Sequence, residues 1–395
     1  MKKILSIVWI ILGSVLIASA DGTNAPLKLR LESPMDYQIF QRATRDQGKV
    51  IIAGAILPES KEALPLDTIQ ARLIGESYTS NALSGKWQKL PFDPRVSGFR
   101  GELAVPAGGW YKLEIVVLRQ NQPVLSNTVE HVGVGEIFVI AGQSNSANYG
   151  EQQNRTLTGL VVAYNGTNWQ LAADPEPGAG GKKGSFMPIF GDAMVKQFNV
   201  PVGIVPMGIG STSVREWLPA GVRFSGLPPL TRNVVTVGPG QWESTGKIFD
   251  TFAGRMKQLG PNGFRAVLWH QGESDANQAN PQNTLAGALY RQDLETIIAD
   301  SRQEIGWNAP WFVAQVSYHN PDDTGTPDIP AAQKAVCDDG FAFPGPDTDV
   351  LTGKMREKNG EGIHLSAEGL KAHAQLWMDR VAPWLERQLD EPDGP

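Results

Sequence analysis

The sequence predicts an α/β protein in which a small all-β region precedes a larger domain built on a parallel sheet. From about residue 135 onward, short apolar segments alternate with longer stretches of helical periodicity, which is the pattern of βαβ units. Between about residues 27 and 133, short period-two segments are separated by Pro, Gly, Asn and Asp, which favours a β-sandwich. The chain has 395 residues, of which 41% are hydrophobic and 19% charged. That length and apolar content predict two or three folded domains rather than a disordered polymer.

The first 20 residues have the pattern of an export signal. Lys2 and Lys3 precede an apolar segment over residues 4–17, and Ala-Ser-Ala at 18–20 resembles a cleavage site. The apolar segment is shorter than a comfortable membrane span. We therefore expect cleavage after Ala20 and a secreted or periplasmic protein without membrane contact once the signal is removed.

Charge and cysteine content exclude several classes of function. The formal net charge is −6, and no run of Lys or Arg is long enough to bind a stretch of phosphates, so nucleic acid is not an expected partner. The single cysteine, Cys337, excludes an intrachain disulfide and any multi-cysteine metal site. No His or Cys spacing typical of a zinc site occurs, and we expect neither a metal nor a cofactor. Nothing in the sequence indicates an oligomeric state.

The individual elements follow from the periodicity. In the N-terminal region the clearest strands are expected at 28–31, 50–53, 68–73 and 110–117. The second domain is expected to contain strands at 136–140, 202–206, 264–269 and 311–316, and helices near 248–259, 284–304 and 366–389. Gly- and Pro-rich segments at 174–183 and 224–241 are interpreted as long loops that shape a pocket. The expected organisation is a signal over 1–20, a β-sandwich over 21–134, an α/β domain over 135–388 and a flexible tail over 389–395.

Polar segments follow the expected strands at their C-terminal ends, where open parallel sheets bind ligands. They read Gly-Gln-Ser-Asn at 142–145, Gly-Ile-Gly-Ser at 208–211, His-Gln-Gly-Glu-Ser at 270–274 and, before the last helix, Gly-Ile-His-Leu-Ser at 362–366. A serine directly after a strand, with a glycine permitting a tight turn, exposes its hydroxyl at the sheet edge. Ser144 is therefore a candidate nucleophile, although a serine here also fits an ordinary helix cap.

A serine nucleophile needs an imidazole to accept its proton and a carboxylate to orient that imidazole. Of the five histidines, His373 falls inside an amphipathic helix where a structural role is expected, and His270 and His364 remain as candidates. Glu361 lies three residues before His364, within reach of the ring. The same pair also fits a helix start capped by a serine, so both interpretations stay open.

The four segments, in this order, resemble the four blocks of the SGNH hydrolases, and most closely the branch of sialate O-acetylesterases and acetylxylan esterases. The resemblance covers about residues 135–388. It implies a flavodoxin-like three-layer fold and a metal-free serine esterase that removes acetyl groups from carbohydrate hydroxyls.

The resemblance also implies roles for individual residues. Ser144 is similar to the family's nucleophile and His364 to its base. The backbone N–H groups of Ser144 and Gly210 would form the oxyanion hole, with the side chain of Gln271 as a third donor where many SGNH enzymes have Asn. The family usually has Asp three residues before the histidine, and Glu361 stands there in this chain. Glu273 of the third block is the competing candidate for orienting His364.

The expected function is therefore an exported carbohydrate O-acetylesterase that works through an acetyl-serine intermediate on an acetylated carbohydrate. The alternatives are an esterase or lipase acting on other acyl esters, and a non-catalytic glycan-binding protein on the same fold. Trp217 is a weaker candidate for walling the sugar site, with ordinary packing as its alternative, and His270 is a second weak candidate for substrate binding. The sequence does not select one acetylated glycan.

Overall fold

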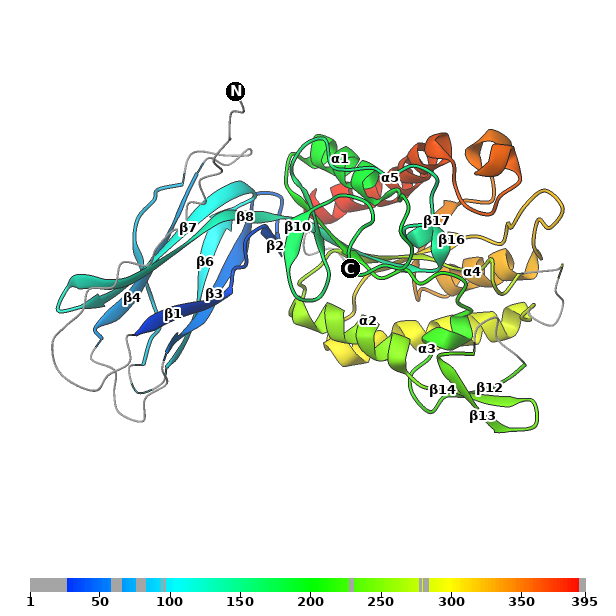
Figure 1. Cartoon of the computed structure of the whole chain (residues 1–395), viewed down its shortest axis with the longest axis horizontal. Coiled ribbons are helices and arrows are strands. Elements are labelled where there is room, and N and C mark those ends of the chain that lie inside the picture. The colour runs from blue at the N-terminus through cyan, green and yellow to red at the C-terminus, as the bar shows by residue number, and fades with distance from the viewer. Residues whose placement is uncertain are drawn as a thin grey trace, which may run out of the picture.

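The computed structural model describes residues 27–57, 66–75, 83–93, 95, 97–226, 231–276, 279 and 284–390. The expected signal at 1–20 and residues 391–395 of the expected tail lie outside the described residues. Figure 1 shows two parts side by side, one made of strands from the N-terminal third and one in which helices cover a central sheet. None of the helices in the described ranges is long and apolar enough to cross a membrane.

The N-terminal part contains two sheets that bury a common core. Its strands are β1 (Lys28–Ser33), β2 (Gln38–Gln41), β3 (Gln47–Leu57), β4 (Thr68–Ile74), β5 (Gln88–Leu90), β6 (Gly98–Pro106), β7 (Gly108–Arg119) and the first half of β8 (Gln122–Gly142). Strands β1, β3 and β6 form one antiparallel sheet, and β5, β4, β7 and β8 pair in the other, with β2 parallel to β8. Alternate residues point inward, so Ile52 of β3 and Leu103 of β6 join Ile69 of β4 and Leu113 of β7 in one hydrophobic cluster.

Strand β8 connects the two parts without a linker. It is 21 residues long, and every residue from Val132 to Gly142 is buried. Its first half pairs with β7, and its second half pairs with β11 and β15 of the central sheet. The expected domain boundary at residues 134 and 135 therefore falls inside one continuous strand.

The central sheet has the order β10-β9-β11-β8-β15-β16-β17. Its other strands are β9 (Val161–Tyr164), β10 (Trp169–Leu171), β11 (Val202–Pro206), β15 (Ala266–His270), β16 (Trp311–Gln315) and β17 (Phe343–Asp347). All neighbours are parallel except the edge hairpin of β9 and β10. Counted along the chain, β8, β11, β15, β16 and β17 give the order 2-1-3-4-5, which is the order of flavodoxin-like sheets.

Helices cover both faces of this sheet. Helices α1 (Met187–Phe198) and α5 (Ala367–Asp390) lie on one face, and α2 (Lys247–Gln258), α3 (Gly287–Ile305) and α4 (Asp328–Asp338) lie on the other. Along β8, Phe138 and Ile140 pack in the cluster that contains α1 and α5, whereas Ile137 and Val139 pack in the cluster that contains α2, α3 and α4. Because successive side chains of a strand point to opposite faces, β8 contributes residues to the hydrophobic core on each side of the sheet.

The four expected strands and three expected helices of the α/β domain are present, and α1 and α4 are additional to them. The expectation that 224–241 is only a loop is wrong, because β12 (Arg223–Ser225), β13 (Val234–Gly238) and β14 (Gln241–Ser244) form a small antiparallel sheet there. The β-branched run Val-Val-Thr-Val at 234–237 accounts for this, since such residues favour strands. The segment 174–183 contains no helix or strand, as expected.

Candidate active site

The serine block lies at the C-terminal edge of the central sheet, where β8 ends beside β15. Gly142 has φ of 125°, and a Cβ at this position would lie 2.1 Å from the carbonyl oxygen of His270. Only glycine fits this turn. Gln143 N–H then donates to the same carbonyl at 2.9 Å, and the short helix η1 (Ser144–Ser146) begins. Ser144 therefore lies next to the third block, at the switch point of the strand order.

Two backbone N–H groups near Ser144 are available to a ligand. The turn after β11 packs against the serine turn, because Ile209 N–H donates to Gly142 O at 2.9 Å. Within the described ranges, the N–H groups of Ser144 and Gly210 have no acceptor in the protein. Ser144 itself is only 4% exposed. Unpaired N–H groups in a site with little solvent suit a developing negative charge.

The carboxylate that contacts His364 is Glu357, seven residues before it. Glu357 Oε1 accepts from His364 Nδ1 at 2.8 Å. Backbone pairing sets this contact, because Glu357 N–H donates to His364 O at 2.8 Å and Gly362 N–H donates to Glu357 O at 3.0 Å. The chain reverses between them in the turn η4 (Lys358–Gly360), where Lys358 and Asn359 have left-handed φ angles of 56° and 59°. A Cβ at Gly362 would lie 2.3 Å from Glu357 Cγ, so this glycine leaves the space that the carboxylate side chain fills.

Neither carboxylate that we expected to orient His364 makes this contact. Glu361 is exposed, and within the described ranges its side chain makes no hydrogen bond to His364. Glu273 is fully buried and accepts from Asn145 Nδ2 at 2.9 Å. Glu361 was expected because it lies three residues before His364, and Glu273 because it follows β15. Both expectations gave the wrong partner for His364 Nδ1.

Burial and charge set the protonation states of this pair. Burial alone would raise the pKa of Glu357, but the hydrogen bond and charge of His364, together with Lys183 at 3.3 Å from Oε2, hold that pKa below its ordinary value. Burial lowers the pKa of His364, and the Glu357 hydrogen bond offsets this only in part. At neutral pH the pair is thus an ionised carboxylate and a neutral imidazole, which is the form that can accept a proton at Nε2.

Asn145 joins the serine turn to the histidine loop. Its Nδ2 donates to Glu273 Oε1 at 2.9 Å and to Ile363 O at 3.3 Å. Burial raises the pKa of Glu273 to about 7. Among the described residues, Ser144 Oγ makes no direct hydrogen bond to His364. Catalytic hydrogen bonds often form fully only when substrate is bound.

Gln271 is not placed as a third oxyanion donor. Its Nε2 donates to Asp275 Oδ2 at 2.7 Å and to Thr212 O at 3.1 Å, and the side chain is fully buried. Asp275 in turn accepts from Ser213 Oγ at 2.5 Å. Because both N–H groups of the amide already have protein acceptors, Gln271 ties the second block to the third instead of facing the site.

The two weaker substrate-binding candidates are also buried. Trp217 is 0% exposed and packs edge-to-face on Phe252 and Trp269, so it belongs to the core. His270 is 2% exposed, and its Nε2 lies 2.9 Å from Thr348 Oγ1. Burial lowers the pKa of His270 to about 3. Neither side chain can touch a sugar at the surface. His373 is structural, as expected, and accepts from Trp377 Nε1 at 2.9 Å.

Three residues at the site escaped the sequence analysis: Glu357, Lys183 and Tyr149. The Tyr149 ring stacks on the His364 ring with centroids 5.2 Å apart and planes at 24°. A signal for Glu357 was present, because Asn359-Gly360 is a strong turn dipeptide that returns the chain on itself. Residues on either side of such a turn face each other, which would have pointed to Glu357 opposite His364.

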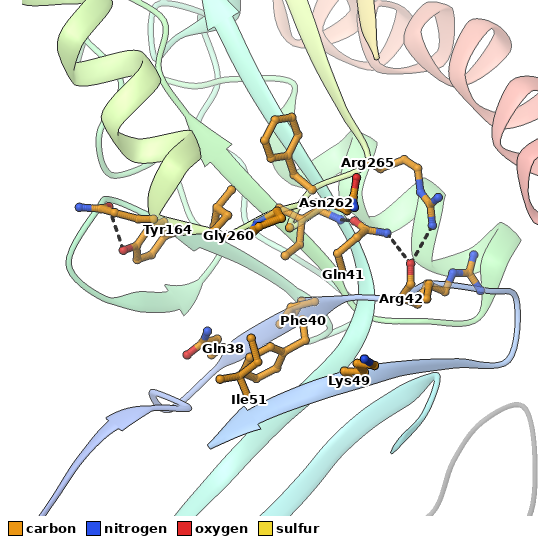
Figure 2. Close-up of a pocket in the computed structure, with 18 of the residues that line it drawn as sticks. Gln38, Phe40, Gln41, Arg42, Lys49, Ile51, Tyr164, Gly260, Asn262 and Arg265 are labelled. Atoms are coloured by element: carbon orange, nitrogen blue, oxygen red, sulfur yellow. Dashed lines mark hydrogen bonds between the residues drawn. The ribbon is translucent and has the colours of Figure 1, made fainter. Parts of the chain in front are cut away.

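A large cavity of the described structure lies elsewhere. It has a volume of about 1000 Å³ and lies between the N-terminal sheets and the start of β15 (Figure 2). In that view Gln41 and Arg265 both donate to the carbonyl oxygen of Arg42, at 3.2 and 3.1 Å. Ile137 lines it, seven residues before Ser144 along the chain, or roughly 20 Å along an extended strand. The cavity is therefore separate from the residues that carry chemistry.

Within the described ranges, no group of three or more His, Cys, Asp or Glu side chains is arranged to hold a metal ion. Cys337 is half-buried, and burial raises the pKa of its thiol to about 11. It is a neutral thiol at pH 7 and not an activated nucleophile.

A protein-family model described as a carbohydrate esterase, sialic acid-specific acetylesterase, matches residues 134–381, which is more than half of the chain. None of the curated proteins matches. Among solved structures, a carbohydrate acetylesterase from Xanthomonas citri has a TM-score of 0.51 at 15% identity, covering 88% of this chain and 74% of that one. A protein from Arabidopsis thaliana has a TM-score of 0.43 at 18% identity, with coverage of 64% and 98%. A family two carbohydrate esterase from Clostridium thermocellum, in complex with cellohexaose, has a TM-score of 0.31 at 11% identity, with coverage of 88% and 90%. The first of these structures shows a shared fold.

Proposed function

The chain belongs to the carbohydrate esterase family of sialic acid-specific acetylesterases, and from this premise we propose that it is a serine esterase whose nucleophile is Ser144. A carbohydrate O-acetylesterase transfers an acetyl group from a sugar hydroxyl to water. In the proposed reaction, Ser144 Oγ attacks the acetyl carbonyl carbon while its proton passes to His364 Nε2. Collapse of the tetrahedral intermediate returns that proton to the sugar oxygen and leaves acetyl-Ser144, which water then hydrolyses with the same base.

Glu357 completes the proposed triad in place of Glu361 or Glu273. Its carboxylate accepts the Nδ1–H of His364 at 2.8 Å. That hydrogen bond keeps the proton on Nδ1 and leaves the Nε2 lone pair free to act as the base. It also stabilises the imidazolium that forms in the transition state. This contact is the single observation that carries the proposal, because a histidine that only packs in the fold does not need a carboxylate to fix its tautomer.

The proposed oxyanion hole consists of two backbone donors. The N–H groups of Ser144 and Gly210 lie on adjacent turns and have no acceptor among the described residues. Gln271 is left out of the hole, because its amide donates to Asp275 and Thr212. We assign Glu273 to bracing, since through Asn145 it holds the serine turn against the loop that carries His364.

We further propose that the N-terminal strands form a β-sandwich and that residues 1–20 direct export, which would bring the enzyme to acetylated polymers outside the cytoplasm. Residues of both N-terminal sheets, such as Ile52 and Ile69, lie in one hydrophobic cluster that continues to α1 and α5, and this supports the first proposal. The charged, apolar and small-residue order at 1–20 supports the second.

The test is Ser144→Ala, assayed for acetate release from a small acetyl ester and from a panel of acetylated glycans. We expect loss of about 10⁴-fold in kcat with little change in melting temperature. Wild-type turnover in this variant would refute the serine mechanism. Faster hydrolysis of long acyl esters than of any acetylated glycan would instead favour a general esterase.

A further inference from the structure

Tyr149 occupies the space between the proposed general base and the proposed oxyanion hole. Its ring lies nearly parallel to the His364 ring, with centroids 5.2 Å apart and an interplanar angle of 24°. At its other end, the phenol oxygen lies against Gly210, where an added Cβ would approach to 2.4 Å. The side chain is half-buried. A single aromatic ring therefore borders both halves of the reaction centre.

Glycines of two loops make room for this ring. A Cβ at Gly181 would lie 2.9 Å from Tyr149 Cδ2, and one at Gly180 would lie 3.5 Å from its hydroxyl oxygen. Together with Gly210, these positions lie against the Cδ2–Cε2 edge and the hydroxyl end of the ring. Any larger residue at Gly181 or Gly210 would displace it, so the ring has little freedom to leave its stacked position.

The backbone on both sides of Tyr149 is fixed as well. Asn148 N–H donates to Gly180 O at 2.9 Å, and Glu151 N–H donates to Leu365 O at 2.9 Å. The second bond ties the tyrosine segment directly to the residue after His364. The stacking distance is thus set by main-chain hydrogen bonds and does not depend on the tyrosine hydroxyl, since within the described ranges that oxygen has no hydrogen-bond partner.

The stacked ring of Tyr149 can interact with the positive charge that His364 carries during turnover. The imidazole becomes a cation when it accepts the Ser144 proton, and burial opposes this charge. The charged groups acting on the ring are Glu357, which favours the cation, and Lys183 and Arg356, which oppose it. The face of an aromatic ring is electron-rich and attracts a cation placed over it. The tyrosine face adds a second favourable interaction, on the side of the imidazole that Glu357 does not reach.

We propose that Tyr149 is a positioning residue for the acetylesterase reaction, which fixes the plane of His364 and stabilises its imidazolium form through the stacked ring. The proposal rests on the proposed function, in which His364 is the general base. It goes beyond it by assigning part of the basicity of His364 to a neighbour outside the triad.

The sign of the effect on pH dependence separates this role from a structural one. Without the aromatic face the imidazolium is less stable, so the pKa of His364 falls and the acid limb of kcat/KM moves to lower pH while the plateau drops. A variant that merely loosens the site would let water reach His364. Its pKa would then rise, and the acid limb would move to higher pH or stay in place.

The experiment compares Tyr149→Phe, Tyr149→Leu and wild type on a small acetyl ester between pH 4 and 9. The Phe variant keeps the ring and should remain within about 2-fold of wild type with an unmoved acid limb. The Leu variant should lose about 2- to 30-fold in kcat/KM, with the acid limb lower by up to about 1.5 pH units, the range expected for a cation over an aromatic face. A Leu variant that matches wild type, or one whose acid limb stays or rises, overturns the proposal.

A fluorinated series at the same position keeps the test independent of folding. Replacing Tyr149 by phenylalanine and then by trifluorophenylalanine preserves shape while withdrawing electron density from the ring face. We expect kcat/KM to fall from the phenylalanine variant to the trifluorophenylalanine variant, and equal values in these two overturn the proposal. Ser144→Ala, measured alongside, distinguishes the two claims: turnover near the wild-type level there defeats the serine mechanism, whereas a flat series with a Ser144→Ala variant that has lost about 10⁴-fold defeats only the role of Tyr149.

Discussion

Replacing Glu357 by Gln should reduce kcat/KM by about 10³- to 10⁴-fold. The smallest loss in kcat/KM to expect is about 10- to 150-fold, which corresponds to the roughly 1.5–3 kcal/mol that a hydrogen bond to a charged group contributes. The upper bound is about 10⁴-fold, which is the cost of holding a catalytic histidine in the wrong tautomer. The structure decides between these bounds through Lys183, whose ammonium lies 3.3 Å from Glu357 Oε2.

An ammonium is only a donor, so it will attract the oxygen of the new amide. The amide N–H₂ group then faces His364 Nδ1, which in the wild-type structure lies 2.8 Å from Glu357 Oε1. A donor at Nδ1 moves the ring proton to Nε2, where the imidazole cannot accept the proton of Ser144. The loss should therefore lie near the upper bound. Removing the ammonium in a Lys183→Met, Glu357→Gln double variant should restore activity by about 10-fold, because the amide can then rotate.

The assay is hydrolysis of one small acetyl ester, with melting temperature measured for each variant. Glu361→Gln is the matched control, since this carboxylate is exposed on the same loop and should stay within about 2-fold of wild type. Glu273→Gln should lose less than Glu357→Gln, because an amide oxygen can still accept from Asn145. A loss of about 10³-fold or more in Glu361→Gln or Glu273→Gln, with Glu357→Gln near wild type, would refute the assignment of Glu357.

Three further outcomes are expected. Gly362→Ala should lower kcat/KM by about 100-fold, because its Cβ would lie 2.3 Å from Glu357 Cγ and displace the carboxylate by about 1 Å; Gly254→Ala in α2, which meets open space, is the control, and equal activity in the two variants would count against the argument. Because burial lowers the pKa of His364, the acid limb of kcat/KM should lie below pH 6.5, and a limb above that value would contradict a buried neutral base. Glu176 is buried without a hydrogen-bond partner for its carboxyl group among the described residues, and burial raises its pKa to about 8. The pKa of Glu176 is higher in the folded state than in the unfolded state, so the stability present below the unfolded pKa is lost as pH rises through about 8. Glu176→Gln should therefore flatten the fall in unfolding temperature between about pH 5 and 9. An equal fall in wild type and Glu176→Gln would argue against this carboxyl as the cause.

The fold was predictable where a pattern depends on neighbours in sequence. The apolar strands at 202–206 and 311–316 and the helix that includes Trp377 follow from periodicity alone, and all three are present. The small sheet of β12 to β14 was missed because Gly and Pro dominate its surroundings, although its Val-rich strand was visible.

The site was predictable only in part, for a similar reason. Ser144 and His364 stand in recognisable blocks at the edge of the sheet. The contact between Glu357 and His364 depends on how the loop turns at Lys358–Gly360. The expectation of a carboxylate three residues before the histidine does not take this turn into account. The burial of Trp217 and Gln271 depends on packing between segments far apart in the chain, which no local pattern encodes.

The central claim is that an acetyl group passes through Ser144, and rapid-quench mass spectrometry of the wild-type enzyme tests it most directly. Mixing with excess acetyl ester and quenching in acid within the first turnovers should yield protein carrying one added acetyl group, and peptide mapping should locate it on Ser144. The same experiment on Ser144→Ala should yield none. Steady turnover with no acetylated protein at any quench time, or an acetyl group on another residue that is chemically competent to react further, would contradict the account.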